Sequence, residues 1–435
     1  MPTALVLRDV GVLELSANRR TALRAGAVFA LVSAVAALFA PRELFGSHTT
    51  GNHFALLAEG WSAGKLDLGG APPAYTGNND FARFDGRYFV AFPPFPAVLI
   101  WPWLRCFGSA EHTPDGLFFV LLAGVAPACL FLALEKLTRI GESLRSTQEN
   151  LLLALAFAFG SVYFFSAVQG TVWFAAHVVG TALCALYLLF ALRADYPIAA
   201  GVALALGFAT RTPLLFAAPL FVIEAVRRSR GLNRDLMSRL VRFAVPIVLV
   251  LALTAWHNFA RFGDAFEVGY RYLDIAWQAR IQRWGLFSYH YLARNLGVVL
   301  TSLPFVPGER GAPFSINLHG LALWFTTPLY LLLPWPARRA RVTLGLALSA
   351  AAVALPSLLY QNTGWLQFGY RFSNDYAPLL FALIAVGARS LRGVGTLLLA
   401  WSLLINGFGA ASFGRPAFAR YYFFERTQSV LYQPD

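Results

Sequence analysis

Ten apolar stretches recur along this sequence, and most of them are close to twenty residues long. A helix of about twenty apolar residues can cross the hydrocarbon core of a bilayer. In lipid, backbone amides must be bonded inside the segment, so repeated stretches of this length predict a bundle of membrane helices. The stretches cover residues 23–41, 116–134, 150–167, 172–193, 198–227, 243–262, 318–335, 344–361, 376–388 and 394–412.

The composition agrees with a membrane protein. Of the 435 residues, 13% are charged and 57% are hydrophobic, whereas a soluble domain has about 25% charged residues. A net charge of +13 could suggest nucleic acid. We exclude that function because the basic residues stand in short runs beside apolar stretches, as they do in cytoplasmic loops of membrane proteins.

These basic runs also predict the orientation. Arginines gather before the first apolar stretch and again at 227–242, 338–341 and 389–392. Cytoplasmic loops carry such an excess of arginine and lysine. If these runs are cytoplasmic, the loops 42–115, 263–317 and 362–375 and the tail 413–435 lie outside.

Two irregular stretches affect the number of crossings. The stretch 198–227 is broken at Arg211-Thr212-Pro213, because proline lacks an amide donor and disfavours helix before it. The short, proline-rich segment 92–107 is expected to lie flat on the membrane. The prediction is an all-α protein of about eleven spans (ten to twelve), with a cytoplasmic N-terminus at 1–22, one membrane domain at 23–412 and an outer tail at 413–435.

The first outer loop holds the densest polar chemistry. Residues 52–63 are expected to form an amphipathic helix at the interface. Two carboxylates and two arginines follow, with Tyr88 beside them. A carboxylate can take a proton from a hydroxyl nucleophile, and arginine suits phosphate. The alternative is a solvated loop with local ion pairs. The charged residues are Asp80, Arg83, Asp85 and Arg87.

Further polar residues stand at expected membrane boundaries. The sequence Gly-Tyr-Arg occurs twice, ending at Arg271 and at Arg371. Both arginines could anchor the interface or face a lipid phosphate. Arg211 is a stronger candidate, because an ionisable group at membrane depth is costly and usually faces a cavity. His177 begins a span from the outer side, where a helix-end hydrogen bond is the simpler explanation.

The order of these features resembles that of the GT-C glycosyltransferases. It is similar to their bacterial family-39-like branch, which includes protein O-mannosyltransferases and aminoarabinose transferases. The resemblance covers roughly residues 23–392. It depends on Asp85-Gly86-Arg87-Tyr88-Phe89 before Pro93-Pro94, on Gly170-Thr171-Val172-Trp173, on the break at Arg211, and on Asn258 with Arg261-Phe262-Gly263.

The resemblance implies an inverting transfer of sugar from a polyprenyl-phosphate donor to an envelope lipid, glycan or protein. The reaction would occur at the outer face of a bacterial cytoplasmic (inner) membrane. An acid residue would assist the acceptor, and basic groups would steady the leaving phosphate. The predicted substrate-binding residues are Asn52, Arg83, Arg87, Tyr88, Trp173, His177, Arg211, Asn258, Arg261, Tyr270, Arg271, Tyr370, Arg371 and Asp375.

The chain departs from the family where the base is expected. The acid residues that usually follow the first span are replaced by Thr50-Gly51. We rank Asp80 first as the substitute base, then Asp85, then His53, whose pKa suits neutral pH. Binding without transfer is a further alternative. No metal motif is present and no cofactor is predicted, although a divalent cation is possible.

Two other functions stay open from the sequence. A carrier or flippase for lipid-linked saccharides would also need arginines at membrane depth. Transporters often carry corresponding breaks in two halves, and only one clear break occurs here, at 211–213. A polymerase or ligase of surface glycans would need a large late outer loop, which 263–317 could supply.

Overall fold

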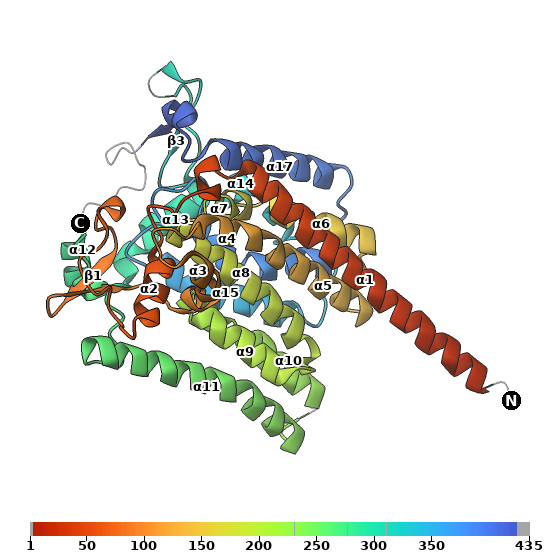
Figure 1. Cartoon of the computed structure of the whole chain (residues 1–435). Coiled ribbons are helices and arrows are strands. Elements are labelled where there is room, and N and C mark those ends of the chain that lie inside the picture. Colours follow the sequence, from red (N-terminus) through yellow and green to blue (C-terminus); the bar gives the residue numbers. More distant parts are fainter. Residues whose placement is uncertain (1–2, 230, 276, 309–310, 424–435) are drawn as a thin grey trace.

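The protein is a bundle of helices with two small sheets at one end (Figure 1). The structure is a computed structural model that describes residues 3–229, 231–275, 277–308 and 311–423. The N-terminal helix α1 (Thr3–Phe39) lies obliquely across one side of the bundle, and its N-terminus extends away from it. The prediction of a mainly helical protein is confirmed, with short strands that the all-α expectation did not include.

Within the described residues, five helical stretches are long and apolar enough to cross a membrane. They are Asn18–Phe39, Asp115–Arg139, Val172–Ala194, Arg234–Phe262 and Val394–Ser412. Four shorter apolar helices accompany them, so the expected eleven crossings stay a prediction. The shorter helices are α3 (Phe95–Phe107), α9 (Pro197–Phe208), α15 (Thr343–Leu358) and α16 (Ala377–Val386).

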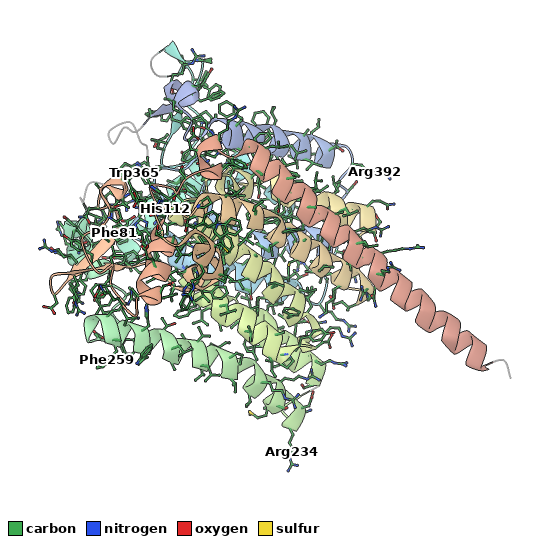
Figure 2. All side chains as sticks on the ribbon, viewed as in Figure 1. Phe81, His112, Arg234, Phe259, Trp365 and Arg392 are labelled. Atoms are coloured by element: carbon green, nitrogen blue, oxygen red, sulfur yellow. The ribbon has the colours of Figure 1, made fainter. Side chains whose placement is uncertain are left out.

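The basic loops meet at one end of the bundle, which we call the basic end. Arg338 Nη1 donates to the Glu142 carbonyl oxygen at 3.1 Å, and Arg145 Nη2 donates to the Arg389 carbonyl oxygen at 2.5 Å. The loop after α5 (Val125–Arg139) therefore lies beside the other arginine runs. In Figure 2, Arg234 and Arg392 lie far from Phe81, His112 and Trp365, which mark the opposite, polar end.

The segment 92–107 lies at the polar end of the bundle. It forms α3, which packs against α2 (His53–Ser62) at the polar end. The segment that leaves α1 and the start of α4 (Asp115–Leu121) meet at the polar end, where the Thr49 amide donates to Asp115 at 2.7 Å, so α3 does not pass from one end of the bundle to the other. Helix α2 forms as predicted, but it is buried on nearly all sides and has no broad exposed polar face.

A hairpin follows α2 in the first long loop. Strands β1 (Phe81–Phe84) and β2 (Arg87–Val90) pair antiparallel, with Phe84 opposite Arg87. Asp85 and Gly86 form the two-residue turn, and both have positive φ, at 50° and 71°. Asp-Gly is a preferred pair for such a turn, because its backbone matches the twist of the strands. Short helices η1 (Arg42–Phe45) and η2 (Ala74–Thr76) complete the loop.

The predicted break after residue 208 is confirmed. Helix α9 ends there, a short helix η5 (Thr212–Ala217) follows, and α10 (Pro219–Ser229) returns toward the basic end. Arg211 has an extended backbone, and its amide donates to the Gly207 carbonyl oxygen at 2.7 Å. Pro213 cannot donate in a continuing helix. The break therefore places the Arg211 side chain against α8 (Val172–Ala191) and not along α9.

The late part of the chain supplies the rest of the polar end. Among its described residues, the segment 263–317 holds short helices separated by irregular stretches. Residues 416–423 lie against this segment through a parallel pairing of β4 with β3, and residues 424–435 of the predicted tail lie outside the described residues. The elements here are η6 (Tyr270–Tyr272), α12 (Gln278–Trp284), η7 (Tyr289–Tyr291), α13 (Leu292–Thr301), β3 (Ile316–Asn317), η11 (Pro416–Tyr421) and β4 (Tyr422–Phe423).

The remaining elements pack into the hydrophobic core of the bundle, which joins early and late helices. Helix α11 (Arg234–Phe262) lies along α9, and α17 (Val394–Ser412) lies on the other side of the bundle (Figure 1). The others are α4 (Asp115–Leu121), η3 (Leu122–Gly124), α6 (Thr147–Phe159), α7 (Tyr163–Ala167), η4 (Leu192–Ala194), α14 (Leu323–Thr326), η9 (Pro328–Leu332) and η10 (Arg371–Asp375).

Candidate active site

The centre of the site is a fully buried carboxylate at the end of η10. Asp375 accepts from Arg211 Nη2 at 2.7 Å and from Arg211 Nε at 3.1 and 3.2 Å. His177 Nδ1 donates to the same carboxylate at 3.2 Å. Burial alone would raise the pKa of Asp375, but the Arg211 guanidinium holds that pKa below its usual range. The three residues come from η10, the break and α8, so the ion pair joins three distant parts of the chain.

A glycine makes room for this arginine. A Cβ atom on Gly180 of α8 would lie 2.7 Å from Arg211 Cγ, closer than real Cβ contacts. Arg211 then passes over the Phe372 ring, with 5.2 Å between its guanidinium carbon and the ring centroid. The close approach lets the side chain reach Asp375 from the break, so a small residue on α8 is part of how the site is built.

Arg371 stands beside this pair with no carboxylate of its own. Among the residues that the structure describes, its guanidinium forms no ion pair. Its Nη1 donates to the Trp365 carbonyl oxygen at 2.9 Å, and its Nε has no hydrogen-bond partner. The guanidinium carbon lies 5.2 Å from the centre of the Phe174 ring. Only 9% of Arg371 is exposed. A buried and unpaired guanidinium suits an anionic ligand, because charge-assisted bonds are strong where water is scarce.

Asp80 approaches from the first loop. Trp173 Nε1 donates to Asp80 Oδ2 at 2.7 Å, which fixes the half-buried carboxylate against the start of α8. Next to it, His53 Nε2 donates to the Asn79 carbonyl oxygen at 2.8 Å. The His53 ring stacks on Phe81 at 4.3 Å. Burial lowers the pKa of His53, so this histidine is neutral near pH 7.

Polar groups from several loops lie near Asp80 and Arg371, and we call the region between them the polar space. The charge of Asp80 acts on Arg371, Tyr270 and Tyr360. Tyr270 is hydrogen-bonded to Tyr360. Burial, and then these neighbours, raise the pKa of Tyr270 well above its usual value. Residues separated by almost 300 positions in the sequence therefore surround a site with a carboxylate on one side and a guanidinium on the other.

Several predicted residues of the first loop lie away from this space. Asp85 occupies the hairpin turn, with 79% of its side chain exposed. Arg87 is also exposed, and it lies 3.7 Å from Asp67 and 3.9 Å from Asp85. Arg83 is exposed above the Tyr88 ring, 5.8 Å from its centroid. Asp67, Asp85 and Arg87 form the local ion pairs that were the alternative for this loop.

The predicted residues near the end of α11 have two different environments. Arg261 is buried, and it donates to the Val90 carbonyl oxygen at 2.8 Å and to Asn258 Oδ1 at 2.8 Å. This contact ties α11 to the hairpin. Arg271 is 75% exposed and lies 3.5 Å from Glu267. The two copies of Gly-Tyr-Arg therefore differ, since Arg271 faces outward.

Two further predicted residues have structural partners. Asn52 begins α2, and its Nδ2 donates to the Tyr75 hydroxyl at 3.0 Å and to the Ala110 carbonyl oxygen at 3.2 Å. The Tyr370 hydroxyl donates to the Ser357 carbonyl oxygen at 3.2 Å. The predicted residues that line or support the polar space are His53, Asp80, Trp173, His177, Arg211, Tyr270, Arg371 and Asp375.

Sequence reasoning missed one buried carboxylate, Asp115, and one residue near the polar space, Tyr360. Asp115 is buried at the start of α4, where it accepts from the Thr49 amide at 2.7 Å and from the Thr49 hydroxyl at 2.9 Å. An acid that opens a span just after Pro114 was the available signal. Tyr360 had no signal of its own, because it follows an apolar helix as an ordinary interface residue does.

The residues present do not fit a metal ion. Among the described residues, no three His, Cys, Asp or Glu side chains lie together as ligands. The Asp115 carboxylate already accepts bonds from Thr49 at both oxygens, and His53 is bonded to a carbonyl oxygen. The positive charge near Asp80 is the guanidinium of Arg371.

Comparisons with known proteins find similarity in structure alone. No protein-family model and no curated protein matches the sequence. An oligosaccharyltransferase from Archaeoglobus fulgidus in its apo form matches with a TM-score of 0.52 and 14% identity. That match covers 91% of this chain and 56% of that protein. The archaeal oligosaccharyltransferase AglB from Archaeoglobus fulgidus, in complex with an inhibitory peptide and a dolichol-phosphate, matches with a TM-score of 0.53, 10% identity and coverages of 90% and 56%.

A third solved structure is ArnT from Cupriavidus metallidurans bound to undecaprenyl phosphate. It has a TM-score of 0.49, 15% identity, and coverages of 88% and 63%. The chain thus spans a little over half the length of the solved structures it matches. The arrangement of helices that brings Asp80, Arg211 and Arg371 together is shared, over nearly the whole chain, with the oligosaccharyltransferase. The chain therefore shares the fold of the membrane part of the archaeal oligosaccharyltransferase that it matches.

Proposed function

We propose that this chain is an inverting glycosyltransferase that uses a polyprenyl-phosphate sugar as donor. The acceptor would be an envelope lipid, glycan or protein at the outer face of the bacterial cytoplasmic membrane. The observation that carries the proposal is that Asp80, a half-buried carboxylate, acts electrostatically on Arg371, a buried guanidinium that has no ion-pair partner among the described residues. The similar protein AglB was solved with a dolichol-phosphate, which supports a lipid phosphate as the anion.

In the proposed step, Asp80 accepts the proton of an acceptor hydroxyl. The acceptor oxygen forms a bond to the anomeric carbon while the bond from that carbon to the phosphate oxygen breaks. The electron pair leaves with the phosphate, whose additional negative charge is stabilised by Arg371. Trp173 holds the Asp80 carboxylate in place at 2.7 Å. Arg211 is committed to Asp375, so it supports the wall of the site, whereas Arg371 has no carboxylate partner among the described residues.

The test uses a deletion strain whose envelope lipids and glycans are compared by mass spectrometry with those of the parent. The sugar that is lost on deletion identifies the product, and each variant is then scored by how much product it restores. Removal of a general base costs about 10²–10⁴-fold in rate, so the Asp80→Asn variant should restore almost none. The control is Asp264→Asn, an exposed carboxylate in a turn at the polar end, which should restore all of it.

Two outcomes would contradict the assignment. If Asp80→Asn restores the product fully, Asp80 is not the base. If Asp85→Asn abolishes the product while Asp80→Asn does not, the base is in the hairpin turn. A carrier is distinguished by assaying transfer in detergent solution, where no compartment exists. A carrier would show no transfer there, whereas the proposed enzyme would retain it.

A further inference from the structure

A groove lies between the late helices and runs from the basic end toward Tyr376. Its volume is about 480 Å³, within the range of roughly 300–1,000 Å³ that is usual for ligand sites. Helix α15 lines it with one face of small residues from Thr343 to Ala354, a length of about 16 Å at 1.5 Å per residue. Leu380, Leu383 and Ile384 of α16 form the opposite wall.

The groove has an apolar body and a cationic mouth. Arg338 and Arg389 line its end at the basic loops. Arg338 donates to the carbonyl oxygens of Gly141 and Glu142 at 3.0 and 3.1 Å. Arg389 donates to the Trp335 carbonyl oxygen. Neither guanidinium forms an ion pair with a carboxylate within the described part of the chain, so both positive charges stay available to an anion.

The carboxylate of Glu142, the residue whose carbonyl oxygen accepts from Arg338, already accepts hydrogen bonds at both oxygens. Glu142 Oε1 accepts from Arg227 at 2.8 Å, and its Oε2 accepts from the Val342 amide at 3.2 Å. Inside the groove, the Thr343 hydroxyl has no hydrogen-bond partner within the part of the chain that the structure describes. A ligand that brings both a negative headgroup and an apolar tail would match every part of this lining.

We propose that the groove binds an anionic phospholipid from the leaflet that faces the basic end. Its phosphate would lie between Arg338 and Arg389, and an acyl chain would lie against the alanines of α15. Basic pockets between membrane helices on the cytoplasmic side bind anionic headgroups in this manner. The alanines at 347 and 351 are exposed, so the groove is open sideways for a lipid to enter.

This site is separate from the proposed catalytic one. The groove ends at Tyr376, whose neighbour Asp375 is bound to Arg211. The lipid would therefore brace α15 and α16 from the basic end without contacting the sugar donor. The proposal stands whether or not the chain transfers sugar, and its readout is bound lipid.

The test is native mass spectrometry of the full chain in detergent, with equal amounts of phosphatidylglycerol and phosphatidylcholine added. The wild type should retain one phosphatidylglycerol selectively. Each basic residue contributes about 1 kcal/mol to attraction of an anionic lipid, so the Arg338→Gln/Arg389→Gln variant should bind it about thirtyfold more weakly. The matched control is Arg339→Gln/Arg392→Gln, which removes two exposed arginines of the same loops that do not line the groove.

A second variant tests the apolar part. Ala347→Leu/Ala351→Leu adds side chains at two exposed positions and fills the groove, so it should fold normally and lose the bound lipid with both arginines intact. Equal lipid retention by the Arg338→Gln/Arg389→Gln variant and by the Arg339→Gln/Arg392→Gln control would overturn the proposal. So would a wild type that copurifies with polyprenyl phosphate in the groove, or retention of phosphatidylglycerol by the filled variant.

Discussion

At the scale of single residues, the site depends on one close approach between helices. Gly180 leaves space for Arg211, whose Cγ would lie 2.7 Å from any added Cβ. We expect Gly180→Ala to push Arg211 away from Asp375, because this contact is near the arginine backbone and cannot be relieved by the tip of the chain. Overpacking of this kind costs about 1–3 kcal/mol.

The measurement is thermal unfolding in detergent together with product restored in the deletion strain, and both should fall. The control is Gly407→Ala, a glycine of α17 where an added Cβ meets nothing within 4 Å. Replacing this glycine by alanine should raise the helix propensity of α17 slightly. Equal behaviour of the two variants would mean that Gly180 has no special part in placing Arg211.

A second prediction concerns the ion pair of Arg211 with Asp375. Removing one partner leaves the other as an uncompensated buried charge, at a cost of about 3–5 kcal/mol. Asp375→Asn alone should therefore lower the unfolding temperature strongly, and Asp375→Leu with Arg211→Leu should destabilise less than the sum of the two single changes. Arg271→Gln, which breaks an exposed pair, should have little effect. Strictly additive losses would argue against the coupling.

At the scale of elements, the packing of α9 on α11 depends on a glycine at the crossing. A Cβ on Gly201 would lie 2.2 Å from the Phe243 carbonyl oxygen, which is backbone and cannot rotate away. We expect Gly201→Ala to separate the helices and lower thermal stability by several degrees, a cost of about 1–3 kcal/mol. Gly26→Ala in α1, where nothing lies within 4 Å, is the control, and similar unfolding temperatures for both would refute the prediction.

The elements also show which features the sequence could predict. The break at Arg211 was predictable because proline has a local and strong backbone effect. The Asp-Gly pair at 85–86 is typical of a hairpin turn. The sequence analysis interpreted the Asp85 carboxylate as a possible base instead. The burial of α2 was not predictable from its own residues, since it depends on packing against α3 and against residues of α8, which comes much later in the chain. The pairing of Arg211 with Asp375 across 164 positions had no local signal either.

At the scale of the whole molecule, the arrangement of the loops predicts how the chain sits in the membrane. The loop after Arg139 shares the basic end with the loops at 338–341 and 389–392, while Asp264 lies in the loop that follows α11 at the polar end. Cytoplasmic loops collect arginine. Single cysteines at Arg139 and Arg392 should therefore be protected in intact cells, and one at Asp264 should react.

The measurement is labelling by a membrane-impermeant maleimide, in a background where Cys106, Cys129 and Cys184 are replaced by serine. Disrupting the membrane should expose both protected sites equally, which controls for local burial. The comparison of Arg139→Cys with Arg392→Cys is the decisive one, because α3 lies between Arg139 and the first span. If the two cysteines label from opposite sides, α3 crosses the bilayer, the basic end is divided, and both the phospholipid groove and the outward-facing site would lose their basis.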